Sequence, residues 1–148
     1  MKNILHSEYL KLFTRVILAA VFIFAAAGKI ADPEEFAVAI SNYRMIPLFA
    51  VNFFAIIIPW IEIVAALLLL FGVSVKESSS ILSLLLIIFI VMISIAVLRG
   101  LDINCGCFGT TEGSKVGLTK IGENIILLLF GIYLILFQNE DKSKFNLK

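Results

Sequence analysis

The two cysteines of this chain, Cys105 and Cys107, are separated only by Gly106. Apolar burial gives no reason to bring two thiols so close together, so the spacing indicates a chemical site. A disulfide across one residue needs a tight bend, because its Cα atoms must lie within about 4.4–6.8 Å of each other, and glycine permits that bend. A bond closed so tightly exchanges readily with a partner thiol. The spacing therefore predicts a redox-active pair, with Cys105 and Cys107 as the catalytic residues.

A soft-metal site is the alternative reading of the same two thiols. A closed zinc site takes four ligands, and the chain has one histidine, His6, which belongs to the N-terminal segment. Copper(I) is the ion that two thiolates on their own would select. We expect no metal site, and copper(I) binding remains the competing hypothesis.

Composition indicates the class of protein. Hydrophobic residues make up 61% of the chain and charged residues 16%, and the mean hydropathy is +1.06. These values are typical of an integral membrane protein, so the lipid bilayer is the first partner expected. The formal net charge of +1 and the lack of a dense basic run exclude a nucleic-acid-binding protein.

Four apolar stretches each approach the roughly 20 residues that cross a bilayer core. A backbone in lipid must satisfy its own hydrogen bonds, so all four are expected to be helices. We predict an all-α fold, a four-transmembrane-helix bundle forming a single domain over residues 1–148. A cleaved signal peptide is the alternative for the first stretch, but Lys29 directly after the small residues is awkward for processing. The predicted spans are about 13–31, 48–73, 80–98 and 118–137.

A short helix is predicted between the first two spans, over Asp32 to Tyr43. Asp32 is a capping residue, Pro33 suits the first helical position, and two acids follow in the first turn. Phe36, Ala39, Ile40 and Tyr43 would share one face. That face either lies on the membrane surface or caps the bundle near the cysteines, unless the segment is an ordinary connecting helix.

Orientation is predicted from the basic residues. With four spans, seven basic residues fall on the side of the termini and five on the opposite side. We therefore expect a multi-pass protein of a bacterial inner membrane, with cytoplasmic termini and the Cys-Gly-Cys loop on the outer face. The periplasm keeps thiols oxidised, which agrees with a redox pair at that location.

Three ionisable residues in or near the spans are candidates for supporting roles, because a charge in a membrane usually faces protein or water. Glu62 falls near the middle of its span, where it must be protonated or paired. Lys29 and Arg99 either snorkel to the headgroups or lower the pKa of a cysteine thiol. Trp60, beside Glu62, is either a packing residue or the wall of a cavity for a quinone.

Short segments of this chain together form a specific pattern: Ala27-Gly28-Lys29-Ile30, Asp32-Pro33, Phe36, Asn42-Tyr43-Arg44 through Pro47, Pro59-Trp60-Ile61-Glu62, Arg99-Gly100-Leu101 and Asn104-Cys105-Gly106-Cys107-Phe108-Gly109. On these segments the chain resembles the MauE family, a branch of the DoxX-like four-helix membrane proteins, over nearly its whole length. Asn104 stands where the family often has an acid, and Glu123 stands where it often has a basic residue.

The resemblance implies a redox-associated membrane protein that works beside a thioredoxin-like protein in maturing disulfide-containing periplasmic enzymes, as in methylamine utilisation. It also adds Tyr43 and Arg44 to the supporting residues. We therefore predict that the protein is a component of a thiol–disulfide oxidoreductase, with the cysteine loop packed between the third and fourth spans. Two other classes stay open: a non-catalytic membrane assembly factor, and a DoxX-like quinone-linked oxidoreductase subunit.

Overall fold

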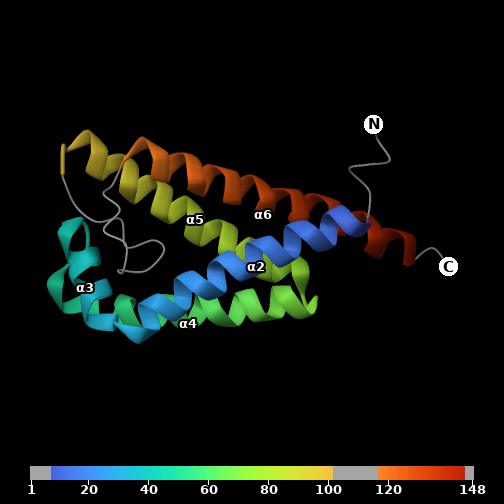
Figure 1. Ribbon diagram of the computed structural model, residues 1–148, viewed down its shortest axis with the longest axis horizontal. Coiled ribbons are helices and arrows are strands. Elements are labelled where there is room, and N and C mark those ends of the chain that lie inside the picture. Colours follow the sequence, from blue (N-terminus) through green and yellow to red (C-terminus); the bar gives the residue numbers. More distant parts are fainter. Residues whose placement is uncertain (1–7, 102–116, 146–148) are drawn as a thin grey trace.

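The computed structural model describes residues 8–101 and 117–145, with side chains as far as Phe137 (Figure 1). All regular secondary structure in these ranges is helical, which confirms the predicted all-α fold. The helices are α2 (Glu8–Ala31), α3 (Pro33–Asn42), α4 (Leu48–Phe71), α5 (Val75–Leu98) and α6 (Leu118–Phe145).

Four of these helices are long and apolar enough to cross a membrane: α2, α4, α5 and α6 as far as Phe137. The chain is therefore a multi-pass membrane protein, as predicted. Two spans begin earlier than expected. Helix α2 starts at Glu8, whose carboxylate accepts a hydrogen bond from Lys11 at 3.2 Å, and α5 starts at Val75, so the buried Ser78 and Ser79 lie within it.

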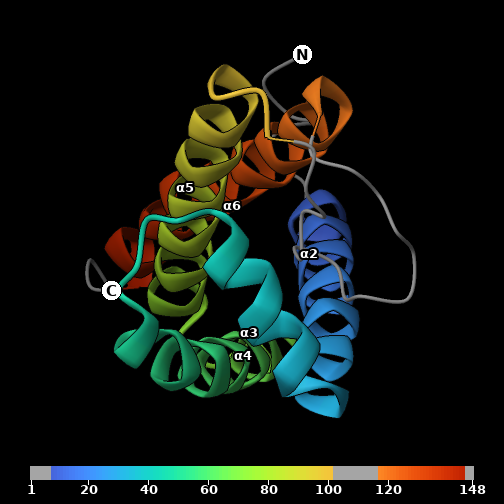
Figure 2. The same ribbon diagram turned by 90° about the vertical axis from the view of Figure 1, so that its left-hand side faces the viewer.

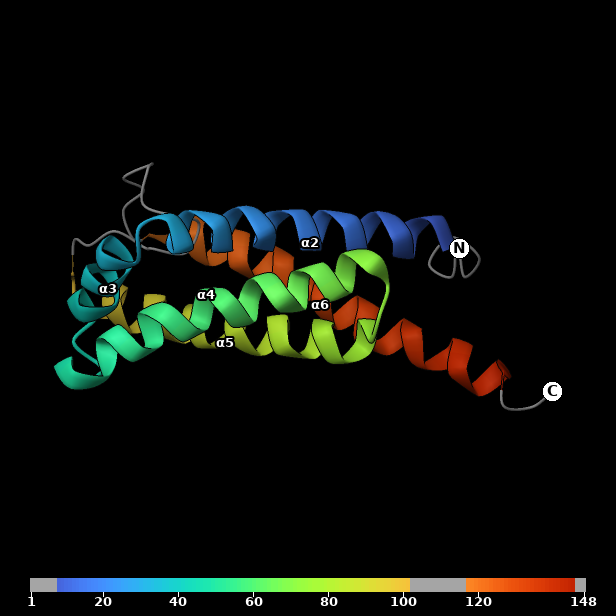
Figure 3. The ribbon, with the colours of Figure 1, turned by 90° about the horizontal axis from the view of Figure 1, so that it is seen from below.

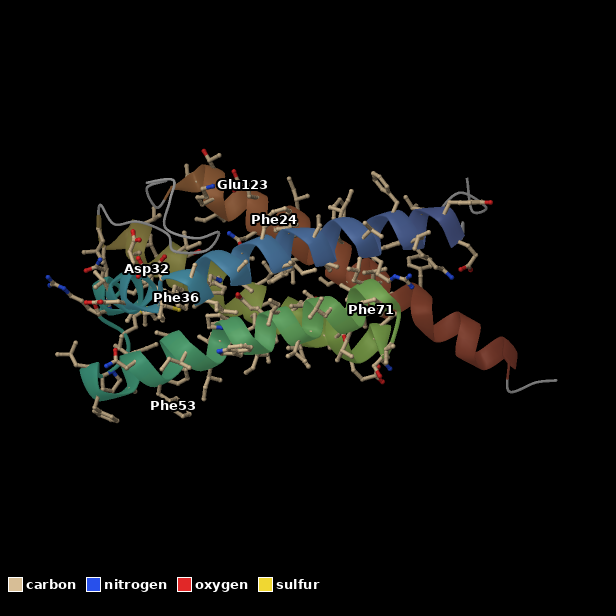
Figure 4. The ribbon with its side chains drawn as sticks, turned by 60° about the horizontal axis from the view of Figure 1, so that its bottom comes forward. Phe24, Asp32, Phe36, Phe53, Phe71 and Glu123 are labelled. Atoms are coloured by element: carbon tan, nitrogen blue, oxygen red, sulfur yellow. The ribbon has the colours of Figure 1, made fainter. Side chains whose placement is uncertain are left out.

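The spans pack as two pairs. Helix α2 lies against α4 and α5 lies against α6, and α4 also contacts α5 (Figure 3). Leu18, Phe22, Leu69, Leu82 and Leu134 are among the buried side chains that join the four spans into one apolar core. Large side chains on the outside, such as Phe53 on α4, point away from the bundle toward the bilayer (Figure 4).

Helices α4 and α5 are joined by a tight turn at Gly72, which has a φ of +75°. The amide of Val73 donates to the carbonyl of Leu68 at 2.9 Å and that of Gly72 donates to Leu69 at 3.1 Å, the pattern of a Schellman motif. A Cβ at Gly72 would lie 2.8 Å from Nη1 of Arg15. Glycine is needed here both for its backbone conformation and for the space beside α2.

Helices α5 and α6 approach closely at Gly131, where an added Cβ would overlap the hydroxyl of Ser83. Ser83 and its neighbour one turn earlier, Ser79, are buried. Small residues at such a contact let two helix backbones come together, which is how membrane helices commonly pack.

The short helix α3 begins as predicted. The Asp32 carboxylate accepts a hydrogen bond from the Glu35 amide at 3.0 Å, and Pro33 occupies the first turn. Its expected inner face is buried, with Phe36 and Ile40 packed on α4 and α5. Helix α3 therefore caps one end of the bundle, between α2, α4 and α5 (Figure 2). We call this the loop end, and the end with Gly72 the hairpin end.

Candidate functional site

The described part of the chain contains a buried ion pair between two spans. Lys29 comes from the last turn of α2 and Glu62 from the middle of α4. The Lys29 ammonium donates to both carboxylate oxygens of Glu62, each at 2.9 Å. Lys29 is 1% exposed and Glu62 is fully buried. Of the partners expected for Glu62, a cation is the one found.

Two aromatic rings enclose the Lys29 ammonium. Nζ lies 4.8 Å from the ring centre of Phe89 on α5 and 5.1 Å from that of Phe36 on α3. A cation over a ring face is attracted by the ring's quadrupole, more strongly in a site without water. The four residues come from four helices, so the ion pair fixes α2, α3, α4 and α5 relative to one another.

The direction of the Lys29 side chain excludes one of the two expectations for it. A snorkelling lysine extends to the headgroups, whereas Lys29 points inward to Glu62, so snorkelling is wrong for this residue. Its charge is already matched by a carboxylate at hydrogen-bond distance. Lys29 is thus a buried cation that joins two helices inside the bundle.

The loop end is organised around Tyr43. Helix α5 stops in a second Schellman motif, in which the Leu101 amide donates to Ala96 and the Gly100 amide to Val97, both at 3.0 Å. Tyr43 is 3% exposed and packs with Met92, Ala96 and Leu101. Burial raises the pKa of the Tyr43 phenol to about 12. The chain that leaves α5 thus begins from a fixed position against α3.

Two exposed arginines flank this contact. Arg44 directly follows Tyr43, and Arg99 is the C-cap residue of α5, just before Gly100. Neither makes an ion pair with any residue in the described ranges. The structure thereby brings three of the expected supporting residues, Tyr43, Arg44 and Arg99, to the loop end, with Lys29 and Glu62 deeper in the bundle.

Cys105 and Cys107, and the predicted packing of their loop between the third and fourth spans, lie outside the described residues. In the sequence, Cys105 follows Leu101, the last described residue at this end of α5, by four positions.

Trp60 and Glu62 do not form one cavity. Trp60 is 56% exposed and, with neighbours on α4 and Ile81 of α5, lines an apolar groove of about 470 Å³, whereas Glu62 faces the interior. Apart from the indole N–H of Trp60, the groove's lining side chains are hydrocarbon. A quinone head needs hydrogen-bond partners for its carbonyls. The groove offers few such partners, and quinone binding stays a prediction.

Sequence reasoning missed the rings around Lys29 and the ion pair between Lys120 and Glu123 on α6. Phe36 was expected on the apolar face of the short helix, but its contact with a cation depends on how α3 lies over α2. On α6, Lys120 and Glu123 pair at 2.9 Å beside a cavity of about 400 Å³ that Val21 of α2 also lines. Asn124 is buried and donates to the Lys120 carbonyl at 2.7 Å. The adjacent polar residues at the start of that span were the available signal.

Comparison with known proteins gives a consistent family. The model of the family described as methylamine utilisation protein MauE matches residues 7–137. The methylamine utilization protein MauE of Methylorubrum extorquens is 31% identical over 123 residues, which is 81% of this chain and 66% of that protein. The corresponding protein of Paracoccus denitrificans is 31% identical over 114 residues, 76% of this chain and 61% of that protein.

A longer relative is also similar. Protein TlpB of Flavobacterium psychrophilum is 28% identical over 151 residues, covering 94% of this chain but 40% of that protein. This chain thus spans about two thirds of the length of the first relatives and two fifths of the length of the longer one. No solved structure matches the chain.

Proposed function

This chain belongs to the MauE family, and from that premise we propose that it supports thiol–disulfide exchange with a thioredoxin-like partner. The clients are periplasmic enzymes that contain disulfides and mature in this way, as in methylamine utilisation. The observation that carries the proposal is the Cys105-Gly106-Cys107 spacing. Two thiols separated by one residue form a strained disulfide that exchanges readily with a partner thiol. Such a disulfide braces the fold poorly, because so short a loop removes little entropy from the unfolded chain.

The reaction needs both cysteines. The thiolate of Cys105 attacks a disulfide of the partner, forming a mixed disulfide and releasing one partner thiolate, which takes up a proton. The thiolate of Cys107 then attacks the Cys105 sulfur, closing the Cys105–Cys107 disulfide and releasing the second partner thiolate. Two electrons pass from the cysteine pair to the partner, and the reverse sequence oxidises the partner.

Two features of the loop end support this role. Leu101, four residues before Cys105 in the sequence, packs against Tyr43. The buried Lys29–Glu62 pair holds α2 and α4 together beneath that end. We place the loop end on the periplasmic side of a bacterial inner membrane, with the termini in the cytoplasm, because the basic residues favour that orientation.

Redox titration of the purified protein tests the proposal. Membrane protein in nonionic detergent is equilibrated with dithiol buffers of known potential, and free thiols are counted by the mass added on alkylation. The chain has two cysteines, so the reading is unambiguous. We expect reversible two-electron behaviour at a potential above about −300 mV, the range of exchangeable disulfides.

The competing classes predict different results. If the protein is a non-catalytic assembly factor, client maturation should continue when Cys105 and Cys107 are both replaced by serine. If it is a thiol exchanger, client maturation should be lost. Tight binding of copper(I) to the reduced protein, together with a pair that does not titrate, would replace thiol exchange by the metal hypothesis.

A further inference from the structure

Arg15 of α2 carries a charge that no group of the described residues matches. The side chain is partly buried, and it makes neither an ion pair nor a hydrogen bond within the ranges that the structure describes. Glu8, the acid of the same helix, accepts from Lys11 instead. The Nε atom of Arg15 is buried and lacks an acceptor. A buried donor of a charged group costs free energy unless something accepts from it, so Arg15 points to an acceptor from outside these residues.

The guanidinium group of Arg15 lies against the turn between α4 and α5. Its Nη1, Cζ and Nη2 atoms are 2.8, 3.3 and 3.5 Å from the point where a Cβ of Gly72 would be. The carbonyls at the end of α4 do not satisfy the group, since those of Leu68 and Leu69 accept from the amides of the turn itself. Arg15 is therefore held between α2 and the turn, with its hydrogen-bond donors still unsatisfied.

The depth of this contact in the membrane follows from the length of α4. The helix has 24 residues, or about 36 Å at 1.5 Å per residue, against a hydrocarbon core of about 30 Å. Its last residue, Phe71, therefore lies near the boundary between hydrocarbon and headgroups, and so does the Arg15 guanidinium beside Gly72. The acceptor that a bilayer provides at this depth is the phosphate of a phospholipid.

Exposed apolar side chains stand on both sides of the Arg15 contact. Phe71 and Val73 flank Gly72 in the sequence and are 75% and 54% exposed, and Figure 4 labels Phe71 at this end of α4. An unmatched cation between exposed hydrocarbon groups is complementary to an amphiphile, whose anionic head meets the cation while its chains cover the apolar side chains. A free anion would use the charge but would leave Phe71 and Val73 uncovered.

We propose that Arg15 and the turn at Gly72 form a binding site for an anionic phospholipid. The planar guanidinium donates to phosphate oxygens in a bidentate manner, which a lysine ammonium does not reproduce. The acyl chains lie along Phe71 and Val73. A bound lipid thereby joins α2 to the α4–α5 turn at the hairpin end. This site is distinct from the proposed thiol exchange, because it is built from other residues at the opposite end of the bundle from Tyr43.

Native mass spectrometry of the purified protein tests this site. Wild type and R15Q in nonionic detergent are titrated with phosphatidylglycerol, and the fraction of protein that carries one lipid gives an apparent Kd. We expect R15Q to raise this Kd about tenfold, since it removes a charged hydrogen-bonded contact. Phosphatidylcholine with the same acyl chains carries no net charge, and its Kd should change less. An equal Kd of wild type and R15Q for phosphatidylglycerol would overturn the proposal.

Three controls separate a built site from general attraction. K76Q removes a cation at the start of α5, at the same end of the bundle, and should keep the wild-type Kd. An equal rise in K76Q and R15Q would show unspecific attraction and contradict the site. Excess inorganic phosphate should not displace the lipid, and displacement would assign the site to a free anion instead. If R15Q does not fold, R15K replaces it: an intermediate Kd supports bidentate binding by the guanidinium, and the wild-type Kd contradicts it.

Discussion

Lys29 and Glu62 are 33 residues apart in the sequence, yet the Lys29 ammonium donates to both Glu62 carboxylate oxygens at 2.9 Å inside the bundle. Each residue is the charge that makes the other tolerable in a membrane interior. The pair joins α2 to α4, and the rings of Phe36 and Phe89 extend the contact to α3 and α5. It thereby holds together the end of the bundle at which α5 stops, shortly before the cysteines in the sequence.

Removing one member of this pair should destabilise the bundle strongly. Glu62→Gln leaves the Lys29 charge buried without its partner, and we expect a loss of about 3–5 kcal/mol in the free energy of unfolding in detergent. Glu123→Gln breaks the more exposed Lys120–Glu123 pair and should lose about 1 kcal/mol or less. The double variant K29M/E62L should recover much of the loss. Equal effects of E62Q and E123Q would show that the buried pair is not structural.

Stability should depend on pH through Tyr43. Because burial raises its folded pKa to about 12, against about 10 in the unfolded chain, the folded state keeps a proton that the unfolded state releases. The stabilisation is complete below pH 10 and is lost as the pH rises toward 12, by up to about 2–3 kcal/mol. Subtracting the pH profile of Tyr43→Phe from that of wild type isolates this contribution from the lysines. Parallel profiles above pH 10 would mean that the phenol is not buried.

The contact between α5 and α6 predicts a graded response at Gly131. Gly131→Ala forces the Ser83 hydroxyl to turn, and a serine in α5 can turn onto a carbonyl one turn back, as Ser80 does at 2.8 Å and Ser94 at 2.7 Å. The loss should be small and should disappear in an S83A background.

Gly131→Leu cannot be accommodated in that way and should destabilise the protein by about 1–3 kcal/mol, measured by thermal unfolding in detergent. Gly122→Ala is the control on α6, since no atom of the described residues lies within 4 Å of its added Cβ. If G131L unfolds at the same temperature as G122A, the close approach of the two helices is wrong.

The proposed orientation can be read by labelling. In a cysteine-free background, a cysteine at Glu34, exposed on α3, should react in intact cells with a membrane-impermeant thiol reagent. A cysteine at Glu77, exposed at the hairpin end of α5, should react only after the membrane is permeabilised. The reverse pattern would place the loop end in the cytoplasm and remove the periplasmic part of the proposal.

Much of this architecture follows from the sequence, for physical reasons. Lipid requires helices of about 20 apolar residues, so four spans could be predicted, and the Asp32-Pro33 start of α3 is a local signal. Depth in the span showed that Glu62 needs a partner. The rings around Lys29 and the meeting of Gly131 with Ser83 depend on how helices cross, which no local pattern specifies.

Trapping of a mixed disulfide in cells tests the central claim most directly. With Cys107→Ser the resolving thiol is absent, so Cys105 should stay joined to a thioredoxin-like protein in a species that a reductant separates, identified by mass spectrometry across the cross-linked peptide. Cys105→Ser should trap less or none. The account is contradicted if neither variant gives such a species although both variants are present in the membrane at the level of the wild-type protein.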